Sequence, residues 1–248
     1  MYPELFTIGS FTIYTYGLCV AMGFFVALQY IVAKNKNNEI SKNQIYDLFF
    51  YLILAGILGA RIFYVLINLN YFIKNPAEII QVYKGGLVYY GGFLSAIVFG
   101  TFYLYKKNIS IKKVLDLFAP ALALGHVFGR IGCFFSGCCY GKETDFFLAI
   151  NNRYPTQLFE SFGNLIIFII LNNVYKKKNS DGVVFVLYLF LYSLLRFLIE
   201  FLRGDYRGSF ILGLSVSQII SICIFVIALL LVLKNKKGNK NGRNNLSR

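Results

Sequence analysis

The sequence has no tryptophan, only one histidine and few charged side chains. Charged residues make up 15% of the chain and hydrophobic residues 57%, whereas a soluble domain is usually about one quarter charged. The mean hydropathy is +0.61. This composition excludes an ordinary soluble domain and predicts a protein that lies in the lipid bilayer. Without tryptophan, tyrosine alone is left to anchor the chain at the membrane interface. A removable signal peptide is not expected, because no basic segment precedes the first apolar stretch and no small-residue cleavage site follows it.

Seven apolar stretches are long enough, or nearly long enough, to cross a bilayer, which takes roughly 20 helical residues. They are Phe11–Ala33, Ile45–Ile67, Leu87–Tyr105, Val114–Phe135, Leu158–Val174, Val183–Leu202 and Ile211–Leu233. No segment has the composition of a linker or of a separate soluble domain. The sequence therefore predicts an all-α integral membrane protein with about seven transmembrane helices. We expect a single polytopic domain over residues 1–233 and a basic tail over residues 234–248.

Lysine and arginine are unevenly distributed between alternate connections. Sixteen lie at residues 34–43, 106–113 and 175–182 and in the C-terminal tail, against six on the opposite side. Because cytoplasmic connections are enriched in these residues, we expect the N-terminus outside and the C-terminus in the cytoplasm. The tail is interpreted as an anchor on anionic lipid and not as an arm that binds nucleic acid.

Three arginines lie inside predicted spans, where a charge costs about 3 kcal/mol or more and usually marks a functional site. Arg61 is explained equally well as a structural residue that reaches the interface or pairs with a carboxylate. Arg196 has two charged companions, Glu200 and Arg203, at helical spacing, which places all three on one face. Arg196 and Glu200 can pair, and the net positive face suits a phosphate headgroup. The alternative is a structural ion pair that joins two helices.

The stretch GHVFGRIGCFFSGCCYG, residues 125–141, places His126, Arg130 and Cys133 on one helix face. Three glycines line the neighbouring side and permit close approach of a helix or a lipid headgroup: Gly125, Gly129 and Gly132. We expect the helix to end after Phe135. An outer loop should follow, with turns at Gly137 and Gly141.

The cysteines of this stretch have the spacing C-x4-C-C, which is neither that of a zinc ribbon nor that of a CxxC redox motif. Inert small residues near a turn are the first interpretation of Cys133, Cys138 and Cys139. A disulfide from Cys133 to either of the others is the second. A Cys₃His site with His126 is the third, and we expect no metal ion.

Two further stretches contain polar residues at the ends of predicted spans. In KGGLVYYGG, residues 84–92, two glycine pairs should break the helix or allow tight packing, and Tyr89 and Tyr90 can donate to an anion. In YPTQLFE, residues 154–160, Pro155 begins a span, and Gln157 and Glu160 form a polar entry face.

In their order along the chain, these motifs resemble the prolipoprotein diacylglyceryl transferase family. The resemblance rests on YTYGL (14–18), GARIFYVL (59–66), GGLVYYGGFLS (85–95), GRIGCFFSGCCYG (129–141), YPTQLFE (154–160), RFLIEFLR (196–203) and GLSVSQIISI (213–222). It implies a multi-pass enzyme of the bacterial cytoplasmic membrane that uses no cofactor. The enzyme would transfer the diacylglyceryl group of phosphatidylglycerol to the lipobox cysteine of preprolipoproteins and release glycerol phosphate.

The resemblance also implies the site residues. Those expected in catalysis are Tyr90, His126, Arg196 and Glu200, and those expected to bind phosphatidylglycerol are Tyr16, Arg130, Gly141 and Arg203. Where the family usually has histidine, asparagine, glutamate and histidine, this chain has Tyr90, Cys133, Cys138 and Tyr154. A neutral tyrosine is a poor base because its pKa is about 10, so His126 becomes the candidate base.

Two other functions stay open. One is a paralogue that transfers a lipid or phospho-group to another acceptor. The other is a transporter or thiol-redox protein without enzymatic transfer, although a transporter more often has internal repeats, which the sequence does not show.

Overall fold

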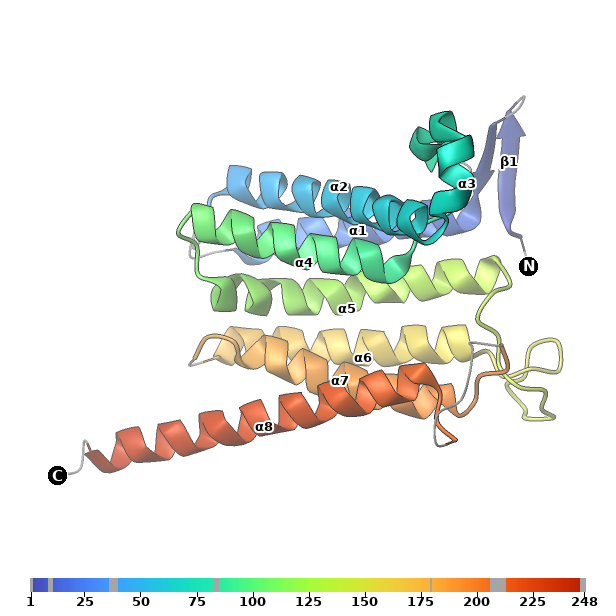
Figure 1. Cartoon of the computed structure of the whole chain (residues 1–248). Coiled ribbons are helices and arrows are strands. Elements are labelled where there is room, and N and C mark those ends of the chain that lie inside the picture. Colours follow the sequence, from blue (N-terminus) through green and yellow to red (C-terminus); the bar gives the residue numbers. More distant parts are fainter. Residues whose placement is uncertain are drawn as a thin grey trace. The chain divides into compact units, whose positions relative to one another are not determined.

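The computed structural model describes residues 2–8, 11–35, 40–82, 85–178, 180–205 and 213–245 (Figure 1). Its elements are the strands β1 (Glu4–Ile8) and β2 (Phe11–Tyr14), the 3-10 helix η1 (Pro76–Ile80) and the helices α1 (Thr15–Lys34), α2 (Lys42–Ile67), α3 (Leu69–Lys74), α4 (Tyr89–Lys106), α5 (Ile111–Phe135), α6 (Thr156–Lys177), α7 (Val183–Glu200) and α8 (Val216–Asn245). The chain divides into two compact units, residues 1–34 with 115–248, and residues 35–114. The prediction of a single membrane domain with a separate tail remains a prediction.

Within the described residues, six helices are long and apolar enough to cross a bilayer: α1, α2, α5, α6, α7 and α8 up to Leu233. Large apolar side chains on these helices are exposed, such as Phe25 (62%), Phe50 (63%) and Leu230 (60%). Lipid accepts such surfaces, whereas water does not. The protein is thus a multi-pass membrane protein. The predicted third span forms α4, which is not among the six, so the count of seven and the orientation remain predictions.

Three boundaries differ from those predicted. The first span begins at Thr15, because residues 11–14 pair with residues 4–8 in an antiparallel hairpin. The chain is therefore not purely helical. Helix α7 ends at Glu200, before Arg203. Helix α8 continues to Asn245 through most of the predicted tail, and residues 211–212 and 246–248 lie outside the described part.

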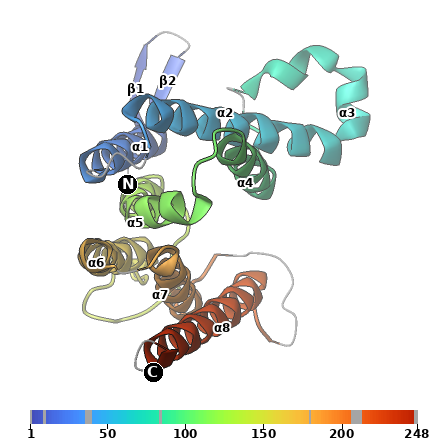
Figure 2. The same ribbon diagram turned by 90° about the vertical axis from the view of Figure 1, so that its left-hand side faces the viewer.

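In the unit of residues 35–114, α4 packs along α2 through glycines (Figure 2). A Cβ atom on Gly91 would lie 2.5 Å from the Cβ of Phe63, and one on Gly92 would lie 2.7 Å from the carbonyl oxygen of Gly56. These two glycines lie inside α4 and do not break it, so the tight-packing alternative holds for them. Gly85, with a φ of 87°, lies before the helix, in a conformation that glycine adopts readily.

Arg61 is a structural residue of the same unit. Its Nε donates to the carbonyl oxygen of Ile79 at 2.9 Å, and its Nη1 donates to those of Gly85 at 2.8 Å and Gly86 at 3.1 Å. The guanidinium carbon also lies 5.3 Å from the ring centroid of Phe72. The arginine thus fastens the loop before α4 onto α2, and backbone carbonyl groups compensate its buried charge in place of the expected carboxylate.

In the other unit, α1 lies against α5 at small residues. A Cβ on Gly132 would lie 2.9 Å from the Cβ of Cys19, and one on Gly23 would lie 3.1 Å from the carbonyl oxygen of Gly125. Gly129 has no atom within 4 Å of such a Cβ among the described residues. Close approach of α1 to α5 is thus confirmed at Gly132 and at Gly125, whose carbonyl oxygen faces Gly23, but not at Gly129.

Helices α6, α7 and α8 run side by side in this unit (Figures 1 and 2). The fully buried Asp116 of α5 attaches the start of α7 to α5. Its carboxylate accepts hydrogen bonds from the backbone N–H of Gly182 at 2.8 Å and of Phe185 at 3.0 Å. It thereby satisfies backbone donors at the start of α7, as a helix cap does, and it also pairs with Lys178 at 3.2 Å. The result is a fixed α7, the helix that contributes Arg196 and Glu200 to the candidate site.

Candidate active site

Arg130 of α5 and Glu160 of α6 form a buried ion pair. The Nη2 of Arg130 lies 2.8 Å from the Oε1 of Glu160, whose side chain is 1% exposed. A charge at this depth requires an opposite charge, so the carboxylate fixes the position of the guanidinium. Sequence analysis assigned Arg130 to the site but left Glu160 only on a polar entry face. The signal was present, since a lone carboxylate within a span needs a partner.

Glu200, the last residue of α7, connects three elements. Its Oε2 lies 2.6 Å from the Nη2 of Arg196, which confirms the predicted pair, and 4.0 Å from the Nε of Arg203. Its Oε1 accepts a hydrogen bond from the hydroxyl of Ser215 at 2.7 Å. Ser215 also caps α8, because its Oγ accepts from the N–H of Gln218 while the Gln218 side chain accepts from the N–H of Ser215. The start of α8 is thereby attached to the carboxylate of Glu200.

Arg203 comes from an extended segment beyond α7, and not from the helix face that the spacing predicted. Its backbone forms an antiparallel bridge with Gly141. Its Nε and Nη2 donate to both carboxylate oxygens of Asp205, at 2.8 and 2.7 Å, and its side chain is 3% exposed. Among the described residues, the buried Nη1 of Arg203 and the buried Nη1 of Arg196 make no hydrogen bond of standard geometry. Each of these two arginines thus has an Nη1 group whose hydrogen-bonding capacity the described side chains do not fully satisfy.

Gly141 lies where three chain segments meet. Its N–H donates to the carbonyl oxygen of Tyr154 at 3.1 Å, and the next N–H, that of Lys142, donates to Leu202 at 2.8 Å. A Cβ on Gly141 would lie 2.5 Å from both the Cβ and the carbonyl oxygen of Tyr154. The prediction of a turn was wrong here, although it was right at Gly137, whose φ is 70°. Glycine is required at position 141 because the segments touch, and not because of its backbone angles.

The three cysteines come together in the loop between α5 and α6. Their Sγ atoms all lie within 4.8 Å of one another, and none of the three forms a disulfide, so the second interpretation given above does not hold. Residues at the start of α6 hold the loop, since Gln157 Nε2 donates to the carbonyl oxygen of Cys138 at 2.6 Å and Thr156 Oγ1 donates to that of Cys139 at 2.9 Å. Cys139 has a φ of 62°, which is uncommon for a residue with a side chain.

Several polar and charged residues of the site affect the pKa of the Cys139 thiol. A hydrogen bond from Cys133 lowers the pKa of the Cys139 thiol below its ordinary value, and a hydrogen bond and charge from Arg203 act in the same direction against the effect of burial. Arg130 also acts on it electrostatically. Burial raises the pKa of Cys138 instead. Arg130 and Arg203, from distant parts of the sequence, therefore lie at one thiol.

The remaining predicted residues lie in different surroundings. Tyr16 of α1 lies beside Gly132, the residue before Cys133, since its Cδ2 would lie 3.2 Å from a Cβ on Gly132. His126 lies among aromatic rings, with its Nδ1 3.4 Å from the hydroxyl of Tyr188 and its ring centroid 5.0 Å from that of Tyr192. Tyr90 belongs to the unit of residues 35–114, in the first turn of α4, and is 55% exposed.

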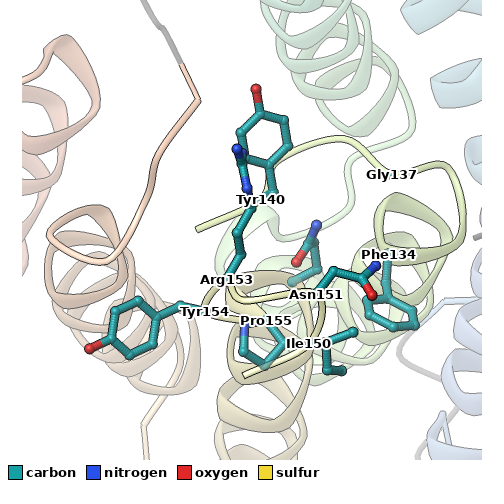
Figure 3. A pocket seen from close by; sticks show the side chains of 9 residues that line it. Phe134, Gly137, Tyr140, Ile150, Asn151, Arg153, Tyr154 and Pro155 are labelled. Atoms are coloured by element: carbon teal, nitrogen blue, oxygen red, sulfur yellow. The ribbon is translucent and has the colours of Figure 1, made fainter. Parts of the chain in front are cut away.

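A cavity of about 230 Å³ borders the cysteine loop (Figure 3). Its lining residues are Phe134, Gly137, Tyr140, Ile150, Asn151, Arg153, Tyr154, Pro155 and Gln157. The guanidinium of Arg153 lies 4.5 Å from the ring centroid of Tyr140. Gln157 both lines the cavity and donates a hydrogen bond to the backbone of Cys138, so the cavity adjoins the loop that carries the thiols.

Comparison with known proteins relates the whole arrangement to one family. A sequence model described as prolipoprotein diacylglyceryl transferase matches residues 3–234. A phosphatidylglycerol–prolipoprotein diacylglyceryl transferase of Finegoldia magna is 38% identical over 239 residues, which cover 94% of this chain and 95% of the relative. Proteins of the same name from Clostridium tetani (34% over 240 residues, 92% and 96%) and Streptococcus pyogenes (31% over 249 residues, 95% and 95%) are also similar.

Proposed function

The chain belongs to the prolipoprotein diacylglyceryl transferase family, and from that premise we propose that it transfers the diacylglyceryl group of phosphatidylglycerol to the cysteine thiol of a preprolipoprotein. Glycerol phosphate is the other product. The enzyme acts in the bacterial cytoplasmic membrane, with its N-terminus outside and its C-terminus in the cytoplasm. The lipid and the preprolipoprotein are its partners, and the proposal includes neither a nucleic acid nor an organic cofactor.

The buried Nη1 groups of Arg196 and Arg203, which lack a hydrogen bond of standard geometry, are the observation that best supports this function. Buried polar groups normally have hydrogen-bond partners, and an unpaired one costs about 1–3 kcal/mol or more. Arg196 and Arg203 each place one Nη1 atom in such a position among the described residues. A phosphate group would satisfy both, because guanidinium groups bind phosphate oxygens through charge-assisted hydrogen bonds. Phosphatidylglycerol brings a phosphate together with chains that lie in lipid.

The proposed chemistry exchanges one bond for another. The acceptor sulfur attacks the carbon of the diacylglyceryl group that is esterified to the phosphate. The C–O bond at this carbon breaks, and its electron pair leaves with glycerol phosphate. Negative charge grows on the leaving phosphate, so Arg130, Arg196 and Arg203 would stabilise the transition state more than the ground state. Glu160 and Glu200 position these arginines, since each carboxylate is buried against one of them. Tyr16 would hydrogen-bond the headgroup beside the cysteine loop.

Tyr90 and His126 remain proposed participants. Tyr90 would donate a hydrogen bond to the headgroup or the leaving group. His126 would accept the proton of the acceptor thiol, because the thiolate is the nucleophile. Loss of transfer in a folded His126→Ala variant would support this role, and retained transfer would exclude it.

Complementation tests the function as a whole. The chain would be expressed in cells depleted of their own diacylglyceryl transferase, and lipid modification of a preprolipoprotein would be measured by its shift in mass. We expect modification with the unaltered chain and with Lys112→Gln, an exposed change at the start of α5. We expect none with Arg196→Gln, and a strong decrease with Arg196→Lys, which keeps the charge but loses the planar fork. A correctly inserted chain that leaves the preprolipoprotein unmodified would contradict the proposal and favour another acceptor.

A further inference from the structure

The three thiols of the loop have the arrangement of a metal site with an open position. Three sulfur ligands about 2.3 Å from a common ion are about 4 Å apart. The Sγ atoms of Cys133, Cys138 and Cys139 all lie within 4.8 Å of one another, so a side-chain movement of less than about 1 Å brings them into range. From the sequence, inert thiols were the first interpretation and a metal site the third, because the spacing C-x4-C-C is neither that of a zinc ribbon nor that of a CxxC redox motif. The fold brings the sulfur atoms together.

The backbone keeps the three sulfur atoms at this place. Cys133 belongs to the last turns of α5, and its carbonyl oxygen accepts from the N–H of Cys138 at 3.2 Å. The side chains of Gln157 and Thr156 bind the next two carbonyl groups, as described above. Cys133 is buried whereas Cys138 is exposed. Hydrogen bonds from α5 and α6 therefore hold the backbone of the cluster, and the exposed Cys138 makes it accessible from the loop.

The ligands and the surrounding charges select the class of ion. Three thiolates favour soft or borderline ions such as Zn²⁺. With a divalent ion they form a complex of net charge −1. Arg203, which is hydrogen-bonded to Cys139, and Arg130, which acts on the same thiol, would stabilise that charge. His126 is not part of the group, since it lies against Tyr188 and Tyr192. The fourth position is consequently left for an external ligand, as in catalytic zinc sites.

We propose that Cys133, Cys138 and Cys139 bind Zn²⁺ and that the acceptor cysteine of the preprolipoprotein occupies the fourth position. This inference rests on the proposed function. The acceptor thiol loses its proton when its sulfur binds the ion, because a coordinated thiol is deprotonated, and His126 as the proposed base would take up that proton. Its thiolate then attacks the glycerol carbon, glycerol phosphate leaves with the electron pair of the C–O bond, and the thioether, a weaker ligand, dissociates.

Metal binding is tested on the full-length chain in detergent, reduced, stripped with a chelator and then supplied with Zn²⁺ or Co²⁺. We expect about one tightly bound ion per chain and a Co²⁺ visible spectrum of tetrahedral thiolate ligation. Cys138→Ser and Cys139→Ser should lose both, whereas Cys223→Ser on α8 should keep both. Cys138→Ala provides a second variant if the serine variant fails to fold. Equal binding by the Cys133/Cys138/Cys139→Ser triple variant, or a disulfide between two of the three in place of an ion, would overturn the inference.

The acceptor role is tested by adding a lipobox peptide to the Co²⁺ form. A cysteine peptide should change the spectrum and a matched serine peptide should not. Transfer from phosphatidylglycerol is measured in parallel, with and without Zn²⁺. Transfer by a chain that binds no ion would overturn the metal site and leave the proposed function intact. A bound ion that responds to the cysteine peptide, in a chain without transfer, would confirm the site and contradict the function. A bound ion that ignores the cysteine peptide would overturn the acceptor role.

Discussion

Gly141→Ala is the most direct test of how the site is assembled. The added Cβ would lie 2.5 Å from the Cβ and the carbonyl oxygen of Tyr154 and 3.0 Å from the carbonyl oxygen of Leu202, where ordinary contacts begin at 3.4 Å. Backbone atoms on both sides prevent a simple side-chain rotation, so the segments must separate by about 1 Å. Such overpacking costs about 1–3 kcal/mol of unfolding free energy. The same shift would displace Arg203, whose backbone bridges Gly141.

Displacement of a positioning group by about 1 Å can lower the rate of a reaction by about 100-fold. We expect this decrease in the initial rate of transfer from phosphatidylglycerol vesicles to a lipobox peptide, together with a lower unfolding temperature in detergent. Gly17→Ala in α1 is the matched control, because no described atom lies within 4 Å of its Cβ and alanine favours a helix by about 1 kcal/mol. A Gly141→Ala rate within threefold of the unaltered chain, with unchanged stability, would refute the reasoning.

Three other substitutions test separate parts of the structure. Glu160→Ala leaves the guanidinium of Arg130 without its buried partner, which should lower the unfolding free energy by about 3–5 kcal/mol and abolish transfer. Thermal unfolding and the peptide assay would measure these two effects, and an active, stable variant would contradict the role of the pair. Asp116→Ala removes the acceptor at the start of α7 and should lower the unfolding free energy by about 3 kcal/mol, with Asp116→Asn intermediate. Arg61→Lys keeps the charge but loses most of the fork of hydrogen bonds to backbone carbonyls, and it should speed proteolysis of the loop before α4; unchanged cleavage would exclude that anchoring role.

Several features follow from the sequence because they depend on local or one-dimensional properties. Apolar segments long enough for a bilayer predicted multiple membrane helices, and the helices of the structure overlap the seven predicted stretches. The pairing of Arg196 with Glu200 follows from their spacing of four residues on one helix. Seven motifs in the right order were enough to indicate the family, which the comparisons then showed. Proposed roles such as those of Tyr90 and His126 are still predictions.

What only the tertiary structure decided concerns contacts between segments that are distant in sequence. Sequence spacing placed Arg203 on the face of α7, but the helix ends at Glu200 and the arginine enters through a bridge to Gly141. It placed Glu160 only on a polar entry face, because the partner of its carboxylate lies on a different helix. It also made a metal site only the third interpretation of the cysteines, since hydrogen bonds from α6 shape the loop that brings the thiols together. Local periodicity fixes what one helix presents, whereas the meeting of three segments at one glycine depends on packing that no single segment encodes.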